Sequence, residues 1–382
     1  MTLANRSDAC GTGVLLVTAL SDGAPSGGRE LLSRLTRDAL ADICGPRLAV
    51  LEIAPDPVTG WRSVDAVFNG YIDGLSREVV ANATAKVKAD AVGTVFIDGS
   101  NFGALAAALK REFSDVRVVT YFHNCEARFF LGAFRQLKSV RSLGVLLANF
   151  LAERSAVQSS DMLICLNERD SEQLFRLYGR SATHISAMAM KDRMPTRTER
   201  MDDTGAGTYA LFVGGAFYAN QAGICWYAEN VASRVDVQVR VVGRGLEPLR
   251  GELERHPNIE VVGAVSDLAS WYFGARFVIA PIFDGSGMKT KVAEALMFGK
   301  RIVGSPEAFT GYEDVADRVG AVCSTPEDFI DAMKAEMIRD YAVIDPKLRS
   351  IYQEKYSFNA ARARMARILG EEGTALGKVG SR

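Results

Sequence analysis

The chain has 382 residues, of which 48% are hydrophobic and 24% charged, and its 45 basic and 46 acidic side chains give a formal net charge of -1. This length exceeds the usual size of one hydrophobic core, so two domains are expected. The balanced charge argues against a nucleic-acid-binding protein, which usually has a strong basic excess.

The cysteines and histidines are too scattered for a metal site or a disulfide framework, both of which need closer clustering. No C-x-x-C pair occurs among the six cysteines, and the three histidines are equally dispersed. We therefore expect reduced cysteines, no metal, and a cytoplasmic protein. The cysteines are Cys10, Cys44, Cys125, Cys165, Cys225 and Cys323.

The first half of the chain alternates short apolar runs with amphipathic ones. The run 13–20 is short for a signal-peptide core and leads into a glycine-rich turn, so it is interpreted as the first buried strand. Strands that are apolar throughout and separated by helices predict a parallel sheet covered on both faces, which is a Rossmann-like α/β domain. Strands are predicted over 14–20, 47–54, 93–99, 117–124 and 161–167, with helices over 27–40 and 101–113.

Residues 127–154 mix aromatic residues and leucines with basic side chains that include Arg128, Arg135, Lys138 and Arg141. A basic amphipathic stretch of this kind can lie on a membrane surface. The alternative is an ordinary helix pair whose apolar face belongs to the core. We favour the helix pair for 143–151 and keep both interpretations for 129–141. No stretch approaches the roughly 20 apolar residues that span a bilayer.

The second half begins with a polar, turn-rich segment, 191–208, that predicts an interdomain linker. The α/β pattern then restarts and predicts a second Rossmann-like domain. Its strands are predicted over 209–215, 237–245, 259–265, 276–283 and 300–306. The predicted organisation is an N-terminal domain (1–190), the linker (191–208), a second domain (209–350) and a C-terminal helix and tail (351–382) that returns to the N-terminal domain.

The segment DGSGMKTKVAEALMFGK, residues 284–300, predicts a phosphate site. Gly285 and Gly287 allow close approach of the backbone and positive φ. A helix that starts near Lys289 or Thr290 offers N–H groups and a partial positive charge, which favour an anion. Lys289 and Lys291 add two full charges, so a phosphate or diphosphate is expected here.

Glu294 lies about one turn inside this predicted helix. A carboxylate there can accept two hydrogen bonds from a sugar diol, as ribose-binding acids do. It can equally be a surface acid paired with Lys291, or one favoured near a helix start. The residues alone leave both interpretations open.

Several segments together resemble the GT-B glycosyltransferases of family four. PIFDGSGMKTKVAEALMFGKRIVGSPEAFTGY (281–312) looks like the C-terminal signature of that family. LFVGGAFYANQAGICWYAENV and VRVVGRG are similar to the first two strand–turn units of its nucleotide domain. In the N-terminal half, SGGRELLSRL, YFHNCEARFF and SSDMLICLNERDSEQLFRLYG resemble its glycine-rich loop, its histidine-bearing loop and its last strand and helix.

The resemblance implies a GT-B fold, with two Rossmann-like domains facing across a cleft. It also implies transfer of a hexosyl group from a UDP- or GDP-type sugar to a saccharide or lipid-linked acceptor. The family mostly retains the anomeric configuration and needs no metal or other cofactor. The expected role is surface polysaccharide or glycoconjugate biosynthesis, by a cytoplasmic protein that can contact the inner face of the membrane peripherally.

The resemblance also assigns residues. Glu294 matches the ribose-binding glutamate, and His123 matches a cleft histidine near the donor sugar, which Glu126 can orient. Gly27 and Gly28 match the loop that faces diphosphate and acceptor, and Arg128 is a weaker candidate there. The expected donor-binding residues are Gly215, Arg244, Gly285, Ser286, Gly287, Met288 and Thr290 together with Glu294.

Two departures from the family pattern concern charge. The acid that the family commonly has eight positions before the glutamate is Ser286 here. Where the family often places an Arg and a Lys after the first strand of the nucleotide domain, this chain has Gly215 or Ala216 and Asn220. We hypothesise that Lys289 and Lys291, with Arg244 as a further candidate, restore this charge, since a departing nucleoside diphosphate requires it.

Three other functions stay open at this point. A nucleotide-sugar epimerase of the same architecture would need more acids and histidines than the chain provides. A non-catalytic glycan- or nucleotide-binding relative fits the missing acid. An NAD-dependent oxidoreductase is disfavoured because no G-x-G-x-x-G follows the first strand.

Overall fold

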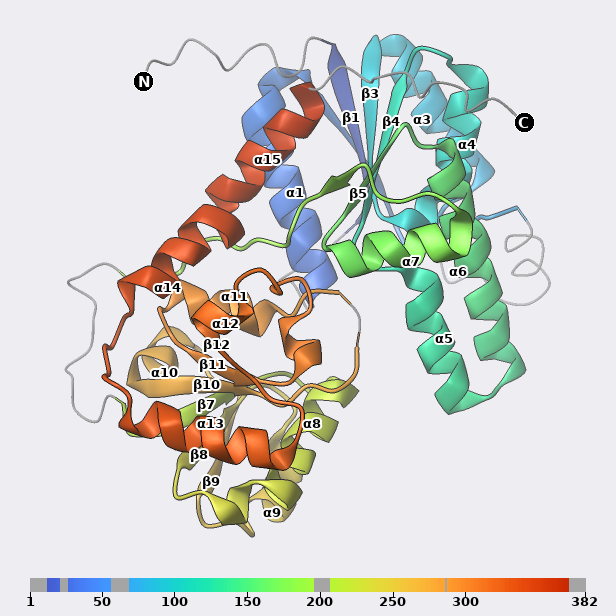
Figure 1. Ribbon diagram of the computed structural model, residues 1–382. Helices are drawn as coiled ribbons and strands as arrows, with labels where there is room; N and C mark the ends of the chain where they lie inside the picture. Colours follow the sequence, from blue (N-terminus) through green and yellow to red (C-terminus); the bar gives the residue numbers. More distant parts are fainter. Residues whose placement is uncertain (1–11, 21–26, 56–68, 196–206, 286, 371–382) are drawn as a thin grey trace, which may run out of the picture. The chain divides into compact units, whose positions relative to one another are not determined.

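The computed structural model describes residues 12–20, 27–55, 69–195, 207–285 and 287–370. It divides the chain into two compact units (Figure 1). The first unit comprises Met1–Ala187 and Ala361–Arg382, and the second comprises Met188–Ala360. Most of the predicted linker, residues 196–206, lies outside the described residues.

The first unit is built on a six-stranded sheet with the order β2-β1-β3-β4-β5-β6, in which every strand pair is parallel. The strand β2 pairs with one edge of β1, and β3 to β6 extend the sheet from its other edge. The direction in which strands are added therefore reverses between β1 and β3. In open α/β sheets, ligands bind outside the carboxyl ends of the strands at such a reversal. The strands are β1 (Gly13–Ala19), β2 (Leu48–Ile53), β3 (Val92–Asp98), β4 (Arg117–Phe122), β5 (Met162–Cys165) and β6 (His184–Ile185).

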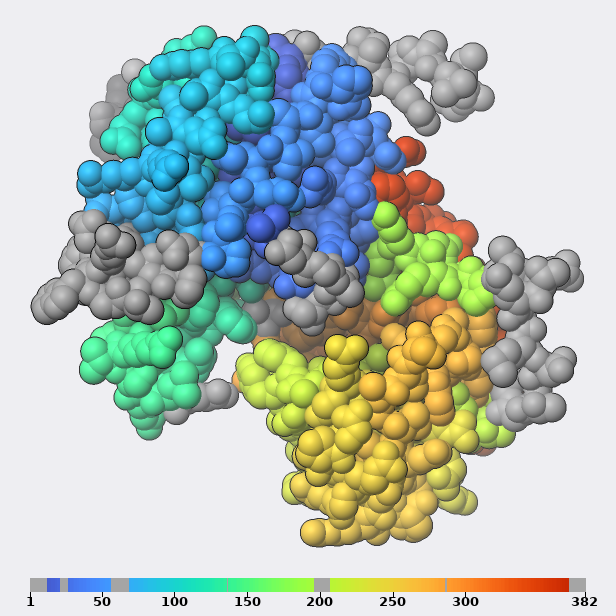
Figure 2. Space-filling model, turned by 180° about the vertical axis from the view of Figure 1, so that it is seen from behind, coloured from blue at the N-terminus to red at the C-terminus, as the bar shows by residue number. Residues whose placement is uncertain are grey.

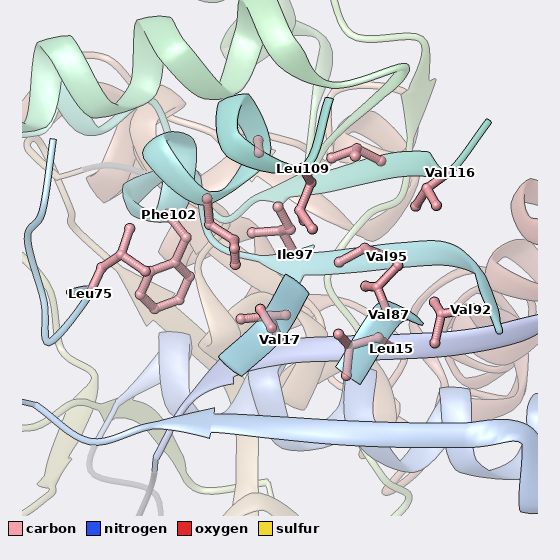
Figure 3. Packing of buried hydrophobic residues seen from close by; sticks show 14 of the residues in the cluster. Leu15, Val17, Leu75, Val87, Val92, Val95, Ile97, Phe102, Leu109 and Val116 are labelled. Atoms are coloured by element: carbon pink, nitrogen blue, oxygen red, sulfur yellow. The ribbon is translucent and has the colours of Figure 1, made fainter. Parts of the chain in front are cut away.

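Helices cover both faces of this sheet (Figure 1). On one face, alternate residues of β1 and β3 such as Leu15 and Ile97 pack on α3 (Arg77–Ala89) and α4 (Gly103–Glu112) in one apolar core (Figure 3). On the other side lie α1 (Gly28–Cys44) and α15 (Phe358–Gly370). The strands are apolar along their length because both faces of the sheet are buried. The predicted parallel sheet is confirmed.

Two antiparallel helices, α5 (Glu126–Leu137) and α6 (Val140–Ser159), form a hairpin whose tip projects from the first unit (Figures 1 and 2). Ser139 caps α6, and Lys138 ends α5 in the left-handed region at φ 45°. After β5 comes α7 (Glu168–Tyr178), capped by Asn167 and ended by Gly179. The predicted helix pair is therefore present, but the expectation that the apolar face of 143–151 belongs to the core is wrong in part, because Leu143, Val145, Leu147 and Leu151 are exposed.

The second unit contains another parallel six-stranded sheet, with the order β12-β11-β10-β7-β8-β9. Its order reverses between β7 and β10, so the loops after these two strands meet at the same edge. The strands are β7 (Tyr209–Val213), β8 (Gln238–Val242), β9 (Ile259–Gly263), β10 (Ala275–Ala280), β11 (Ile302–Gly304) and β12 (Gly320–Val322). The main helices are α8 (Tyr218–Asn230), α11 (Thr290–Met297) and α13 (Pro326–Ile338), with short helices α9 (Arg250–Leu253), α10 (Ala269–Gly274) and α12 (Ala316–Val319).

The C-terminal segment is helical but interrupted. It forms α14 (Pro346–Ile351), a π-helical turn (Tyr352–Tyr356) and, after Ser357 leaves the helical region at ψ 158°, α15. Within the first unit, Arg117 donates to the carbonyl of Leu369 at 2.6 Å, and Arg362 lies 3.5 Å from Asp42. From Ala361 on, the chain belongs to the first unit.

The structure differs from the sequence-based prediction at short strands. β10 ends at Ala280, three residues before the predicted end, because Pro281 has no N–H to continue the ladder. The strands β6 and β12, of two and three residues, were not predicted. Elements of that length are too short to show any periodicity.

Candidate functional site

In the second unit, the loops after β7 and β8 are packed backbone against backbone. Gly243 has φ 150°, and a Cβ there would lie 1.7 Å from the carbonyl oxygen of Gly214. A Cβ on Gly245 would lie 2.7 Å from that of Ala216. This close packing leaves Gly215 and Arg244, both predicted donor-binding residues, exposed at the carboxyl ends of the strands.

The turn between β10 and α11 has the predicted glycine geometry. Gly285 and Gly287 have φ of 125° and 63°, values that residues with a side chain rarely adopt. Met288 is buried against Gly311, where a Cβ would lie 2.4 Å from the Met288 side chain. Tyr312 donates to the carbonyl of Lys289 at 3.0 Å and so anchors the start of α11. Ser286 lies outside the described residues.

The helix α11 starts at Thr290, which is half-buried, with Lys289 as its N-cap residue. An ammonium group cannot accept a hydrogen bond, so Lys289 does not cap the N–H groups of the first turn. Its Nζ donates to the carbonyl of Gly287 at 3.0 Å and lies 2.9 Å from Oε1 of Glu307. Glu307, which the sequence did not identify, thus neutralises part of the positive charge at this helix start.

Lys291 is buried at the reversal of the sheet. Its Nζ donates to Oδ1 of Asn220 at 2.8 Å and lies 4.7 Å from the centre of the Phe212 ring. Burial, with a smaller contribution from Lys289, lowers the pKa of Lys291 to about 7 against the opposing effect of Glu294. The basic side chain beside Asn220 of α8 is thus supplied by Lys291 of α11.

Glu294 is also largely buried, with 11% of its side chain exposed. One carboxylate oxygen pairs with Arg193 of the same unit, and the other accepts from the Tyr272 hydroxyl at 3.2 Å. Glu294 is therefore not a surface acid, and its structural partners are Arg193 and Tyr272. Neither partner was identified from the sequence, because 101 and 22 residues separate them from Glu294.

In the first unit, Gly27 and Gly28 lie at the start of α1, next to the reversal of that sheet. Gly27 is the N-cap residue, in an extended conformation, and a Cβ there would meet nothing within 4 Å. The conformation of Gly27 therefore does not require glycine. The exposed helix start remains compatible with an anion.

His123 follows β4 and is 7% exposed. Its Nε2 lies 2.7 Å from Oδ1 of Asp98, the last residue of β3. The group that orients His123 is thus Asp98, and the expectation that Glu126 does so is corrected. The signal was available in the sequence, since Asp98 is an acid at the carboxyl end of an apolar strand.

Glu126 begins α5 and is buried, and burial raises its pKa to about 7, with Arg29 opposing and Glu153 and Asp73 adding to the effect. The backbone N–H groups of Glu126 and Ala127 donate to Glu153 of α6 at 2.9 and 3.1 Å. Glu153 therefore caps α5 from a neighbouring helix. Arg128 is exposed on α5.

Two further findings concern the described part of the chain. No group of three or more His, Cys, Asp or Glu side chains there is arranged to hold a metal ion. Among the helices described, none combines the length and the apolar character needed to cross a bilayer.

Comparisons with known proteins agree with this architecture. Residues 207–340 match the family model "Glycosyl transferases group 1". No curated protein gives a significant match to the sequence. Among solved structures, HepE from Anabaena in complex with UDP is similar with a TM-score of 0.67 and 13% identity, covering 94% of this chain and 99% of HepE.

Two further solved structures share the fold. Sucrose-phosphate synthase from Thermosynechococcus elongatus gives a TM-score of 0.66 at 14% identity, covering 93% of this chain and 98% of the synthase. The trehalose 6-phosphate synthase of Burkholderia multivorans gives 0.59 at 12% identity, covering 94% and 96%. These likenesses confirm the GT-B fold of two Rossmann-like domains.

Proposed function

We propose that this protein transfers a hexosyl group from a nucleoside-diphosphate sugar to a saccharide or lipid-linked acceptor, and that the second unit binds the donor. The observation that carries the proposal is the contact between Lys291 and Asn220. It places a buried ammonium at a position where the resembled family often has its own basic residue. A diphosphate at this sheet edge would compensate that buried charge.

The surrounding residues fit a nucleotide. The glycine turn and the start of α11 offer N–H groups for phosphate oxygens, and Lys289 supplies a second charge. Glu294, held at a fixed place by Tyr272, has the acceptor oxygens that a ribose diol needs. HepE has been solved with UDP and with UDP-glucose, which makes a uridine nucleotide the first donor to test.

In the proposed mechanism, charge develops on the diphosphate as the bond to the anomeric carbon stretches. Lys289, Lys291 and the start of α11 stabilise this charge more strongly than that of the intact donor, which accelerates the reaction. The acceptor oxygen bonds to the anomeric carbon on the face from which the diphosphate leaves, and the leaving phosphate oxygen takes the proton of the acceptor hydroxyl, so the anomeric configuration is retained. Neither a carboxylate pair nor a metal is needed for this path.

Nucleotide release from UDP-, GDP- and ADP-sugars, measured with and without saccharide or lipid acceptors, tests the proposal. We expect release that depends on one donor and rises with an acceptor. Lys289→Ala and Lys291→Ala should each lower turnover and donor affinity, whereas Lys334→Ala, which removes an exposed lysine of α13, should not. Intact turnover and donor binding in both variants would contradict the assigned role of these lysines.

An anionic membrane surface is the proposed location of a lipid-linked acceptor. At the tip of the α5–α6 hairpin, the apolar side chains of Leu137 and Val140 are 69% and 89% exposed. They alternate with the exposed basic residues Arg135, Lys138 and Arg141. Basic side chains bind anionic lipid headgroups, and apolar side chains next to them insert at the boundary between headgroups and acyl chains.

We expect the protein to float with anionic liposomes at low salt and to be released at high salt. Replacing both Leu137 and Val140 by Ser should abolish flotation without lowering thermal stability, because neither side chain is buried. No association with anionic liposomes at low salt would remove this proposal and leave the donor site unaffected.

A further inference from the structure

The two carboxylate oxygens of Glu294 have partners of different kinds. Oε2 accepts from the hydroxyl of Tyr272 at 3.2 Å. The Tyr272 ring is fully buried and stacks on Phe298, with the ring centres 4.6 Å apart and the planes at 11°. Oε1 pairs with the guanidinium of Arg193, whose side chain is 52% exposed. Packing therefore fixes Tyr272, whereas the Arg193 side chain can turn into solvent without disturbing the core.

The main chain at Arg193 is held at the end of α11. Its N–H donates to Sδ of Met297 at 3.3 Å. The preceding residue, Asp192, forms an ion pair with Arg349, which also donates to the carbonyl of Met297 at 2.6 Å. Glu294 lies three residues before Met297 and so on the same side of the helix. Loss of the contact between Arg193 and Glu294 therefore requires the rotation of one side chain and no movement of the backbone.

The guanidinium of Arg193 covers the oxygen that a ribose would use. A guanidinium only donates hydrogen bonds, and it satisfies a carboxylate oxygen in the same way as the hydroxyls of a diol do. A ribose that approaches Oε1 of Glu294 thus meets a donor already in place. An ion pair with an exposed partner contributes little free energy, so a ligand that makes further contacts can displace it.

We propose that Arg193 competes with the nucleotide for Glu294: it occupies Oε1 in the free protein, and the ribose displaces it while Tyr272 keeps Oε2. The ribose as the ligand of Glu294 rests on the proposed function. The competition goes beyond it, because it lowers the nucleotide affinity of the free protein. It also couples occupation of the site to release of a side chain from the segment 191–208, which the sequence predicts as the linker.

Nucleosides are the sharpest probes of this competition, because uridine, guanosine and adenosine carry the ribose without phosphate. Loss of a positive charge would by itself weaken the binding of anionic UDP, and an uncharged nucleoside avoids that effect. We expect Arg193→Ala to bind a nucleoside about two- to fivefold more tightly than the wild type, measured by titration of the NMR signals of the nucleoside. The control Arg255→Ala removes an exposed arginine of the same unit and should leave the affinity unchanged.

Salt provides a test on the unaltered chain, which holds even if Arg193→Ala does not fold. Salt screens an ion pair that is half exposed. Raising sodium chloride from 50 to 500 mM should therefore strengthen nucleoside binding by the wild type about twofold, and it should not change binding by Arg193→Ala. Nucleoside affinity of the wild type that stays constant or falls with salt would contradict the competition.

Trypsin reports directly on the Arg193 side chain, since the protease must bind that side chain in its own specificity pocket. We expect a saturating nucleoside to accelerate cleavage between Arg193 and Met194 severalfold, as measured by mass spectrometry of the peptides. Cleavage after Lys191 is the control, because Lys191 lies 5.6 Å from the Phe358 ring and not on Glu294. Equal acceleration at both bonds would mean that the whole segment loosens, which would contradict the exchange of one side chain.

Competition by Arg193 and nucleotide binding fail in different ways. If a nucleoside or UDP binds, but Arg193→Ala binds it equally well, the competition is refuted and the donor site stands. Weaker binding of nucleosides by Arg193→Ala would also refute it and would make Arg193 a part of the nucleotide site. If neither the wild type nor Arg193→Ala binds any nucleoside, UDP, GDP or ADP, the donor site assigned to the second unit is contradicted, and the displacement of Arg193 with it.

Discussion

Burial of Lys291 lowers its pKa, whereas the negative charge of Glu294 raises it. The ammonium is enclosed by Asn220 and the Phe212 ring, and its pKa falls to about 7. A group that gains or loses its proton near neutral pH makes anion binding sensitive to pH. The same residue type on an exposed helix would stay charged throughout this range.

We expect the affinity for UDP to fall as pH rises from 7 to 9. Diphosphate binds the protonated lysine, so above pH 7 binding must take up a proton, and affinity falls by up to about tenfold per pH unit. Isothermal titration in buffers of different ionisation enthalpy measures this proton uptake. Lys291→Met should bind more weakly and show no such pH dependence. An equal slope in the variant would assign the titration to another group.

The pair of Glu294 and Arg193 permits a second test at this scale. If Glu294 binds ribose, Glu294→Gln should weaken UDP binding about 10- to 100-fold, since a hydrogen bond to a charged group contributes about 1.5–3 kcal/mol. Arg193→Ala should leave binding unchanged or strengthen it, because Arg193, half exposed, occupies one of the carboxylate oxygens. Equal weakening by both substitutions would indicate that the ion pair serves only to hold the structure.

At the scale of elements, close helix contacts position the loops that carry function. Gly103 at the start of α4 allows α6 to approach, since a Cβ there would lie 1.9 Å from the carbonyl oxygen of Ala152. Ser155 of α6 also donates to the Gly103 carbonyl at 3.0 Å. Glu153, two residues before Ser155 in α6, caps α5, so this contact determines where α5 begins.

Gly103→Ala and Gly144→Ala form a matched pair in the same unit. The first should destabilise by about 1–3 kcal/mol, because the added methyl overlaps the α6 backbone. The second should stabilise by roughly 0.5–1 kcal/mol, since Gly144 lies inside α6 and a Cβ there meets nothing within 4 Å. Urea unfolding followed by circular dichroism measures both. A similar loss of stability in the two variants would contradict the close contact.

At the scale of the whole molecule, the chain enters the second unit at Met188 and returns to the first at Ala361. Met365, Ile368 and Leu369 of α15 are buried, and Arg364 donates to the carbonyl of Ala187 at 2.8 Å. The helix α15 is therefore part of the core of the first unit, although the whole second unit separates it from the rest of that unit in the sequence.

Deleting residues 361–382 should destabilise the first unit and not the second. Burial of three apolar side chains contributes about 5–9 kcal/mol, at about 1.5–3 kcal/mol each. Trp226 and Trp271 lie in the second unit, so in a Trp61→Phe background tryptophan emission reports on that unit alone. We expect an early loss of circular dichroism and an unchanged emission transition. A parallel shift of both would mean that the units unfold together.

The two doubly wound sheets and the glycine turn at 284–287 were predictable from the sequence, because they depend on local signals. Apolar runs of strand length alternate with helical periodicity, and glycines precede a helix start that carries lysines. A helix between successive strands returns the chain to the same edge of the sheet, so the strands pair in parallel whatever the side chains of the site are.

The partners of the charged residues were decided only by the tertiary structure. Asp98 meets His123 across 25 residues, Asn220 meets Lys291 across 71, and Arg193 meets Glu294 across 101. The order of strands in each sheet brings these side chains together, and no local pattern encodes that order. For the same reason, the sequence identified the lysines and the glutamate as candidates, while burial and pairing determined the partner of His123 and the pKa of Lys291.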